Sequence, residues 1–600
     1  MRPGFPISTG EFLHLLQRCM PPDGWPRAVG VANSGGPDSA CLLFLLASVV
    51  RNHNGARGLP QKVVSLHVNH ALQKASFDMV HAAEQAALRA QVHHRTLNIP
   101  WGRSSYPDKP QENQPSEQIA RDARYRLLFR TMIHEDLPAI AYGHHADDQV
   151  ETAIMRLAMG SSDLGAAGMR PVRRWGMGES SGTQPYGPHG MSRWIVRPLL
   201  TVPKDRILLT CETYGLLYAH DPTNFQPSLT LRNAIRHHLS QAKTVDMGED
   251  TFEREGMLKG RDVDNRANTD KSEDASKGED MPSGKDIDND LALTTPGPHI
   301  SADNAAQCSL EERPDVLKAI QNLQNRSPDI PGRDGLRNAV RLLGERVETI
   351  DTQVNNHLVR ACLPSPPSTV ILRSQALSLV TEPEVRVALV RRVLRYVSPR
   401  LWGSLQAEVC GDRERLDGIV RAVWGTLHAP SARRSKSSGA NVLWVPGIVR
   451  QNGPFRIRNE LSWNQGWAWL VRRAKPIADY KLARIGRANT LNRDVTDILL
   501  DGILRQGLCE VMYDARFLVT MDISAMPEDI AASITYKTGR VFILPGQTWL
   551  NPRVVWRRTE KPDEELASIG WDLGRWKPVD VASRRSKWIQ MRCIRTLEAI

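Results

Sequence analysis

Cysteine is scarce in this sequence, and its spacing argues against several classes of site. The chain has eight cysteines in 600 residues, and no two of them form a C-x-x-C pair. This spacing argues against a zinc ribbon, an iron–sulfur centre and a disulfide-stapled scaffold, and it is typical of a reducing compartment. The sequence also lacks any apolar run of about 18 residues, so we expect no transmembrane helix.

Acidic residues are fewer than basic ones. The 66 Asp and Glu against 78 Lys and Arg leave a net charge of +12. A basic excess favours a polyanionic partner such as a nucleic acid, although many basic proteins bind none. The N-terminal segment lacks a signal-peptide core, and its arginines are mixed with Glu11 and Asp23. A mitochondrial transit peptide therefore stays an open alternative.

Strand and helix patterns alternate through the first 240 residues. We expect strands at 28–32, 62–68, 92–99 and 138–142, and helices at 38–50, 77–91, 116–135 and 147–159. Alternation of this kind predicts an α/β domain with a parallel sheet and helices on both faces.

Composition divides the chain into four parts. Residues 1–240 form the α/β domain, and residues 241–333 are expected to be a disordered polar insert, because mixed charge with few aromatics cannot offset chain entropy. Residues 334–435 show apolar residues at helical spacing and predict a helical domain. Residues 436–600 predict a smaller mixed α/β region rich in Trp and Arg.

The strongest local signal is a phosphate-binding loop between the first strand and the first helix after it. It reads Ser34, Gly35, Gly36, Pro37, Asp38 and Ser39. Glycines let the backbone approach phosphate oxygens, and a helix N-terminus offers free N–H groups. The carboxylate of Asp38 suits such a site when magnesium lies between it and the phosphates. The loop is not a G-x-x-x-x-G-K-[ST] motif, and the alternative is a plain Ser-Gly turn.

A second motif follows the fourth strand. It contains His144 and His145, then Asp147, Asp148 and Glu151 at the start of a helix. Asp147 and Glu151 are four apart and share a helix face, while Asp148 lies about 100° around the axis. Such carboxylates can hold magnesium, bind a substrate ammonium or act as a general base. The simpler alternative is an acidic first turn with Asp147 as the N-cap.

These motifs together resemble a known family. The loop is similar to that of the N-type ATP pyrophosphatases (PP-loop superfamily), and the second motif resembles the H-H-x-D-D-Q-x-E-T element of the tRNA(Ile)-lysidine synthetases. Further segments resemble that family in the same order, at 67–72, 117–125, 165–169, 197–200, 221–224 and 232–236. The likeness covers about residues 28–240. Two departures are Asn33, where the family has an apolar or small residue, and Gln73, where it has arginine.

The resemblance implies an enzyme that uses ATP and Mg²⁺ to adenylate the wobble cytidine of a tRNA(Ile) with a CAU anticodon. Free L-lysine then displaces AMP to give lysidine. The implied catalytic residues are Asp147, Asp148, Glu151 and His144, with Asp38 and Asp147 as metal ligands. The implied nucleotide-binding residues are Ser34, Gly35, Gly36, Pro37, Asp38, Ser39, His67, Arg121 and Arg124.

The second half of the chain is expected to contact the tRNA. Trp469, Arg472 and Arg473 are candidates, with a buried tryptophan and solvated arginines as the alternative.

Three other functions stay open. They are a tRNA thiolase of the same superfamily, another amidating ligase such as GMP synthetase, and an inactive tRNA-binding relic. A thiolase usually has cysteine pairs, and an amidating ligase needs an ammonia supply. The long insert is typical of a eukaryotic protein, so we expect a mitochondrial location, with the cytoplasm as the alternative. The family also suggests a homodimer.

Overall fold

The computed structural model describes most of the chain with gaps. The described residues are 4–53, 55–72, 76–103, 106–110, 116–178, 186–220, 230–245, 313–404, 407, 413–427, 434–438, 440–449, 455–456, 466–475, 491–547, 549–559, 561–572, 577–579 and 587–598. The segment at 221–224, Gln73 and most of the predicted insert lie outside them.

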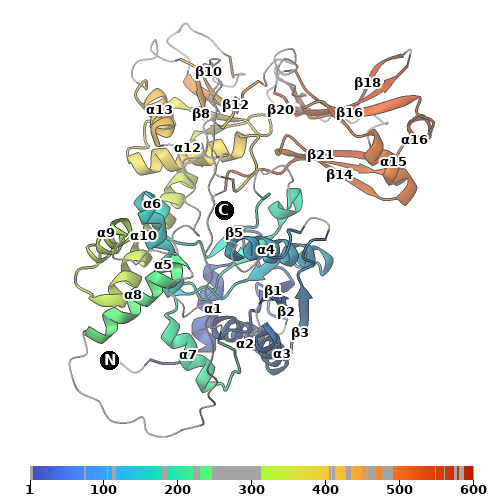
Figure 1. Cartoon of the computed structure of the whole chain (residues 1–600). Helices are drawn as coiled ribbons and strands as arrows, with labels where there is room; N and C mark the ends of the chain where they lie inside the picture. The colour runs from blue at the N-terminus through green and yellow to red at the C-terminus, as the bar shows by residue number, and fades with distance from the viewer. Residues whose placement is uncertain are drawn as a thin grey trace, which may run out of the picture.

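A six-stranded sheet organises the N-terminal domain (Figure 1). Its strands are β1 (Ala28–Ala32), β2 (Lys62–Asn69), β3 (His93–Asn98), β4 (Ala139–Ala141), β5 (Val172–Arg174) and β6 (Trp194–Val196). Their order is β3-β2-β1-β4-β6-β5, and all neighbours are parallel except the edge pair β5–β6. The predicted parallel sheet is confirmed.

Helices cover both faces of this sheet. One face packs against α1 (Thr9–Arg18), α2 (Pro37–Asn52), α3 (Ser76–Ala90) and α7 (Lys204–Thr213). The other face packs against α4 (Ser116–His134). Residues of β2 alternate between the two cores, with Val63 in the first and Val64 in the second, because successive side chains of a strand point to opposite faces.

Two strands of this sheet were not expected from the sequence. Strands β5 and β6 have three residues each, and β5 reads Val-Arg-Arg. A run so short carries no alternation, so only its pairing with a neighbour defines it as a strand.

Helix α5 (Ala146–Ala158), which carries the motif after β4, packs against helices that come much later in the chain. The helices α8 (Leu231–Val245), α9 (Pro314–Gln324) and α10 (Gly332–Ala361) gather around it (Figure 1). Their shared core contains Ile154 of α5, Ile235 of α8, Ile320 of α9 and Val340 of α10.

The end of the predicted disordered insert differs from expectation. Residues 314–324 of that insert form α9, and its Val316, Ala319 and Leu323 are buried. Apolar residues at positions 316, 319, 320 and 323 follow helical spacing, and α5 and α10 supply the surface that covers them.

The predicted helical domain also contributes strands. It holds α10, α11 (Ser374–Leu377), α12 (Pro383–Val397) and α13 (Arg413–Trp424). Strands β7 (Cys362–Leu363) and β8 (Val370–Arg373) join β10 (Val442–Val449), β11 (Phe455–Arg456) and β12 (Gly466–Arg473) in one sheet. The boundary expected at residue 435 therefore cuts through a continuous fold.

The last part is a mixed α/β region, as expected. It contains β13 (Arg493–Asp494), α15 (Thr496–Arg505), β14 (Leu508–Tyr513), β15 (Phe517–Asp522), α16 (Glu528–Thr535), β16 (Gly539–Pro545), β17 (Pro552–Arg558), β18 (Lys561–Ser568) and β21 (Ile589–Cys593).

Trp469 is fully buried, and Arg473 pairs with Asp514 at 2.6 Å. The sequence left a buried tryptophan and solvated arginines open as the alternative to tRNA contact. Trp469 is such a buried tryptophan, whereas Arg473 is buried and ion-paired rather than solvated. None of the helices in the described ranges is long and apolar enough to cross a membrane.

Candidate nucleotide-binding and catalytic site

The site lies where the strand order reverses. Strands β1 and β4 are neighbours, and their connections leave in opposite directions, which opens a crevice at their carboxyl ends. The phosphate loop follows β1, and the His144 motif follows β4. At Gly143 an added Cβ would lie 2.9 Å from the carbonyl carbon of Asp38. Only glycine permits this close approach of the two loops.

The buried side chain of Asn33 supports the phosphate loop through hydrogen bonds. Its buried side-chain oxygen accepts hydrogen bonds from the Gly35 N–H at 3.0 Å and from the Ser39 hydroxyl at 3.2 Å. Its amide nitrogen donates to the Ser65 hydroxyl at 3.1 Å and to the carbonyl of Ala83 at 3.0 Å. The residue that departs from the family pattern therefore ties the loop to β2 and α3.

The loop's own shape also depends on glycine and serine. Gly35 has a φ of +82°, and an added Cβ would meet the Met79 carbonyl oxygen at 2.3 Å. The Ser34 N–H donates to the Ser39 hydroxyl at 3.1 Å. Gly36 then caps α2, with Pro37 in its first turn. This is a compact turn at a helix N-terminus, which suits an anionic group.

Asp38 faces two cationic or polar partners. Its Oδ1 is 2.5 Å from Nζ of Lys204 and 3.6 Å from Nε2 of His145. Asp38, near the end of the phosphate loop, therefore links that loop to the start of α5 and to the start of α7.

His145, rather than Asp147, is the N-cap of α5. The imidazole Nδ1 of His145 accepts a hydrogen bond from the backbone N–H of Asp148 at 3.4 Å. The backbone N–H of His145 in turn donates to Asp148 Oδ2 at 3.1 Å. This reciprocal capping box replaces the cap by Asp147 that the sequence left as an alternative. Capping fixes the carboxylate of Asp148 and leaves that of Asp147 available for other contacts.

Asp147 is held by two donors from distant parts of the chain. Its Oδ2 accepts the Lys204 backbone N–H at 3.0 Å, and its Oδ1 accepts Arg337 Nη2 at 2.7 Å. Burial opposes ionisation of this carboxyl, but Arg337 and the Lys204 N–H outweigh it and lower its pKa.

Glu151 sits one helical turn further along α5 and is almost fully buried. Arg236 of α8 binds both its oxygens, at 2.8 and 2.9 Å. Burial is the largest influence and raises the pKa of Glu151 despite Arg236. Burial opposes ionisation of the neighbouring Asp148, but His145 and Arg232 outweigh it and lower the pKa of that carboxyl.

His144 is kept neutral by its surroundings. Its ring stacks on Tyr142 with centroids 5.6 Å apart, and its Nδ1 is buried with no hydrogen-bond partner. Burial, followed by the charge of Arg197, lowers its pKa to about 3. A neutral imidazole beside Asp148 can donate or accept one hydrogen bond but carries no charge at neutral pH.

The predicted residues on α4 join a cationic cluster. Arg121 and Arg124 lie 5.8 and 6.0 Å from the ring of Tyr125, which stacks on Tyr142. Burial raises the pKa of Tyr125, but Arg121, Arg197, Arg124 and Arg173 together lower it. The cluster therefore offers a strongly positive environment next to the His144 motif.

His67 lies behind the phosphate loop. It is buried, and its Nδ1 is 2.8 Å from the carbonyl oxygen of Asn33. Burial lowers its pKa, so the ring is neutral and can donate to that carbonyl. In this position His67 supports the loop backbone from the side of β2.

Sequence reasoning missed Lys204 and Arg337. Lys204 comes four positions after the family-like segment at 197–200, and this closeness in the sequence was the signal that could have placed it at the site. Arg337 carried no signal, because it is 190 positions from Asp147.

The site offers one carboxylate, that of Asp38, that is suited to binding Mg²⁺ together with substrate phosphates. Within the described ranges, no three His, Cys, Asp or Glu side chains are grouped to hold a metal ion. Magnesium commonly takes one or two carboxylates and completes its shell with water and substrate phosphates. Asp38, beside the loop, fits that role. Asp147 fits it less well here, because both of its oxygens already accept hydrogen bonds.

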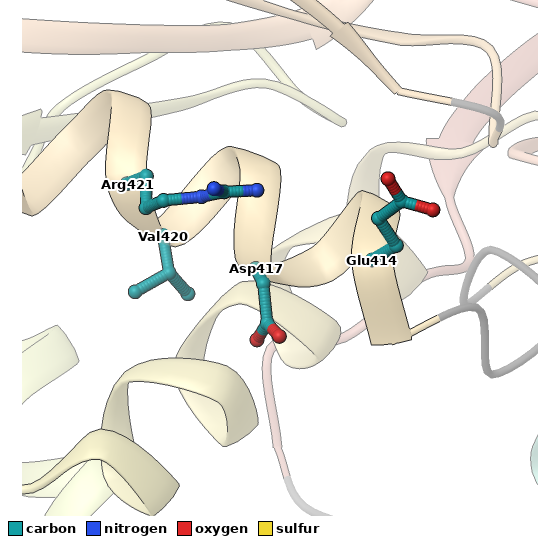
Figure 2. Close-up of a pocket in the computed structure, with 4 residues that line it drawn as sticks. All are labelled: Glu414, Asp417, Val420 and Arg421. Carbon is teal, nitrogen blue, oxygen red and sulfur yellow. The ribbon is translucent and has the colours of Figure 1, made fainter.

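A separate pocket lies along α13. It has a volume of about 590 Å³ and is lined by Glu414, Asp417, Val420 and Arg421 (Figure 2). None of these residues belongs to the motifs, and we assign the pocket no role.

Comparison with known proteins agrees with this geometry. Residues 11–243 match the PP-loop domain family. A tRNA(Ile)-lysidine synthase of Bacillus subtilis is 35% identical over 211 residues, which are 35% of this chain and 38% of that protein. A probable tRNA(Ile)-lysidine synthase of Schizosaccharomyces pombe is 33% identical over 224 residues, covering 37% of this chain and 46% of that protein.

A solved structure gives a weaker likeness. The U34-tRNA thiolase NcsA of Methanococcus maripaludis has 18% identity and a TM-score of 0.29, over 39% of this chain and 73% of that one. The chain covers less than half the length of the two synthases. Residues 11–243 thus match the PP-loop domain family, and the curated relatives that the chain resembles carry the name tRNA(Ile)-lysidine synthase.

Proposed function

We propose that this protein is a tRNA(Ile)-lysidine synthase. The observation that carries the proposal is the meeting of the phosphate loop and the carboxylates of α5 at one switch point of the sheet. A nucleotide bound at the loop would have its phosphates next to Asp38, with Asp148 and Glu151 further along the same crevice.

The first step is transfer of AMP to the wobble cytidine of a tRNA(Ile) with a CAU anticodon. O2 of the cytidine attacks the α-phosphorus of ATP, and pyrophosphate leaves. Positioning and charge stabilisation dominate such steps. Magnesium, held by Asp38 and the phosphates, would supply neutralising charge. The helix N-terminus at Ser39, together with Arg121 and Arg124, supplies further positive potential.

The second step forms the carbon–nitrogen bond. The ε-amine of lysine attacks C2 of the activated base, and AMP leaves with the bonding electrons of the broken C–O bond. The amine must first lose a proton, since its ordinary pKa is about 10.4. The candidate bases are Asp147, Asp148 and Glu151. The raised pKa of Glu151 suits proton acceptance, but Arg236 binds both of its oxygens and would have to release one of them first. Asp148 is suited to attract the lysine ammonium.

Lys204 and Arg337 limit what Asp147 can do in this scheme. Their hydrogen bonds use both of its oxygens, so we assign Asp147 to holding the site together. Loss of Asp147 would still abolish activity, because Lys204 and Arg337 would lose their common acceptor.

The parts of the chain beyond residue 243 are proposed to contact the tRNA, and the protein is proposed to act as a homodimer in mitochondria. The positive charge of the chain supports a nucleic-acid partner. A fluorescent fusion that stays purely cytosolic would contradict the mitochondrial location.

The decisive measurement is incorporation of labelled lysine into RNA. Purified protein is incubated with Mg²⁺, ATP, radiolabelled lysine and an unmodified CAU-anticodon tRNA(Ile), with Asp147→Ala as the control. We expect ATP-dependent label that survives mild base, which removes aminoacyl esters, and that is lost in the variant.

Two other outcomes would redirect the proposal. Pyrophosphate release with tRNA but no lysine label would support an adenylating enzyme with another second substrate, such as sulfur or ammonia. Neither release nor label would indicate a nucleotide-binding relic and refute the proposed function.

A further inference from the structure

Arg337 brings α10 into contact with the catalytic motif. Its Nη2 and Nε donate to Oδ1 of Asp147 at 2.7 and 3.2 Å. Arg337 lies outside residues 11–243, the segment that matches the PP-loop domain family. A residue from the second part of the chain therefore binds a residue at the centre of the first.

This contact is sheltered from solvent. The Arg337 side chain is 12% exposed, and that of Asp147 is 18% exposed. Arg337 also reaches Asp334 at 2.8 Å and Asp205 at 3.3 Å, but both of those carboxylates are well exposed. Exposed pairs contribute little, whereas a hydrogen bond to a charged group in a sheltered place contributes more. Asp147 is thus the main partner of Arg337.

The contact continues through Asp147 to the phosphate loop. The other oxygen of Asp147 accepts the Lys204 N–H at 3.0 Å, and Lys204 Nζ lies 2.5 Å from Oδ1 of Asp38. Each of these four residues sits in the first or second turn of its helix, on α10, α5, α7 and α2. The starts of four helices therefore meet in one continuous chain of charged contacts.

Apolar packing holds α10 in this place. Leu336 and Val340 of α10 lie in the same buried cluster as Val150 and Ile154 of α5. Leu336 and Arg337 are adjacent on α10, so the packing that buries the first also fixes the direction of the second. The geometry does not depend on the ion pair alone.

We propose that Arg337 is a positioning residue for the adenylation step. It fixes Asp147, and through Lys204 it fixes Asp38 beside the phosphates. This inference rests on the proposed function, and it assigns part of the active site to a helix outside the PP-loop domain.

The test compares three variants of the full chain. Arg337→Met removes the donors, Arg337→Lys keeps the charge, and Arg341→Met is the matched control. Arg341 lies one turn further along α10, is exposed, and pairs with Glu345 at 2.6 Å. Pyrophosphate release is measured with CAU-anticodon tRNA(Ile), together with melting temperature, Mg-ATP affinity and lysine incorporation.

We expect Arg337→Met to lower kcat for pyrophosphate release by about 10- to 100-fold, with KM for tRNA unchanged. Arg337→Lys should recover part of this loss but not all, since lysine lacks the planar guanidinium. Arg341→Met should stay within about twofold of wild type. If Arg337→Met does not fold, the reduced kcat of Arg337→Lys carries the test.

Several outcomes would overturn the inference. They are a wild-type kcat in Arg337→Met, an equal loss in Arg341→Met, or a rise in KM for tRNA with no change in kcat. Pyrophosphate release without lysine incorporation in wild type would refute the proposed product and leave this comparison valid. If wild type releases no pyrophosphate, Mg-ATP affinity decides, and equal affinity in wild type and Arg337→Met would refute the role of Arg337.

Discussion

The titratable residues of the motif after β4 differ in whether burial or neighbouring charge decides the direction of the pKa shift. His144 has its pKa lowered by burial and Arg197, so it is neutral, whereas Asp148 has its pKa lowered by His145 and its neighbours and is ionised. One turn on, burial raises the pKa of Glu151. Titratable groups whose pKa values are pushed apart are typical of acid–base sites.

The neutral state of His144 predicts how stability depends on pH. Its folded-state pKa of about 3 is below the ordinary value of 6.5. The unfolded chain therefore binds a proton that the folded chain excludes between these values, and stability must fall as pH drops through that window. His67 and His94 act in the same direction, because burial also lowers their pKa values.

His144→Asn isolates the contribution of this residue. Urea unfolding at about pH 7 and about pH 5 should show a smaller loss of stability in the variant than in wild type. The comparison stays above the range in which Asp147 and Asp148 become protonated. Equal losses in the two proteins would show that His144 is not held neutral.

At the scale of elements, α5 combines chemistry on one face with packing on another. Asp147 and Glu151 point to Arg337 and Arg236, while Ala153 and Ile154 are fully buried against later helices. The position of the α5 carboxylates thus depends on α8, α9 and α10 as well as on the sheet.

Helix α9 is expected to contribute measurably to stability. Leu323→Ala removes a fully buried side chain from the cluster around α5 and should lower the free energy of unfolding by about 2–5 kcal/mol. Leu317→Ala, on the exposed side of the same helix, should cost less than about 1 kcal/mol. Chemical denaturation of both variants checks this, and equal effects would mean that α9 does not dock as described.

Local sequence located most elements of the N-terminal domain. The expected strand at 28–32 coincides with β1, and the expected helix at 147–159 is shifted by one residue from α5. These signals are local periodicities and turn residues. The strands β5 and β6 and the helix α9 were not predicted. Each of the two strands has three residues, which is too short to show a period, and α9 follows a long polar run of sequence.

At the scale of the whole molecule, the first and second parts of the chain form a continuous structure. Asp351 of α10 binds Arg170 of the N-terminal domain at 2.5 Å and also Arg392 of α12. Near the C-terminus, Glu598 contacts Arg174 of the edge strand β5 at 3.2 Å. These links join the C-terminal regions to the N-terminal domain.

A chain ending at residue 245 should therefore fail to fold stably. It would expose Val150, Ile154 and Ile235, which α9 and α10 normally cover. A chain in which a short Gly-Ser linker replaces residues 246–312 should keep its cooperative melting transition, since α8 and α9 both pack on α5. Calorimetry and size-exclusion chromatography of the two proteins test this. A stable monomer of the chain that ends at residue 245 would show that the N-terminal domain folds without α9 and α10.

The sequence by itself determined the alternation of the first domain, the phosphate loop and the carboxylates of α5. Short-range periodicity, and glycines at a positive φ or a close approach, encode these features locally. Only the tertiary structure decided that His145 caps α5, that Asn33 ties down the loop, and that Arg337 and Arg236 bind Asp147 and Glu151. The physical reason is that burial and charge depend on neighbours in space, and Arg337 is 190 positions from the carboxylate it binds.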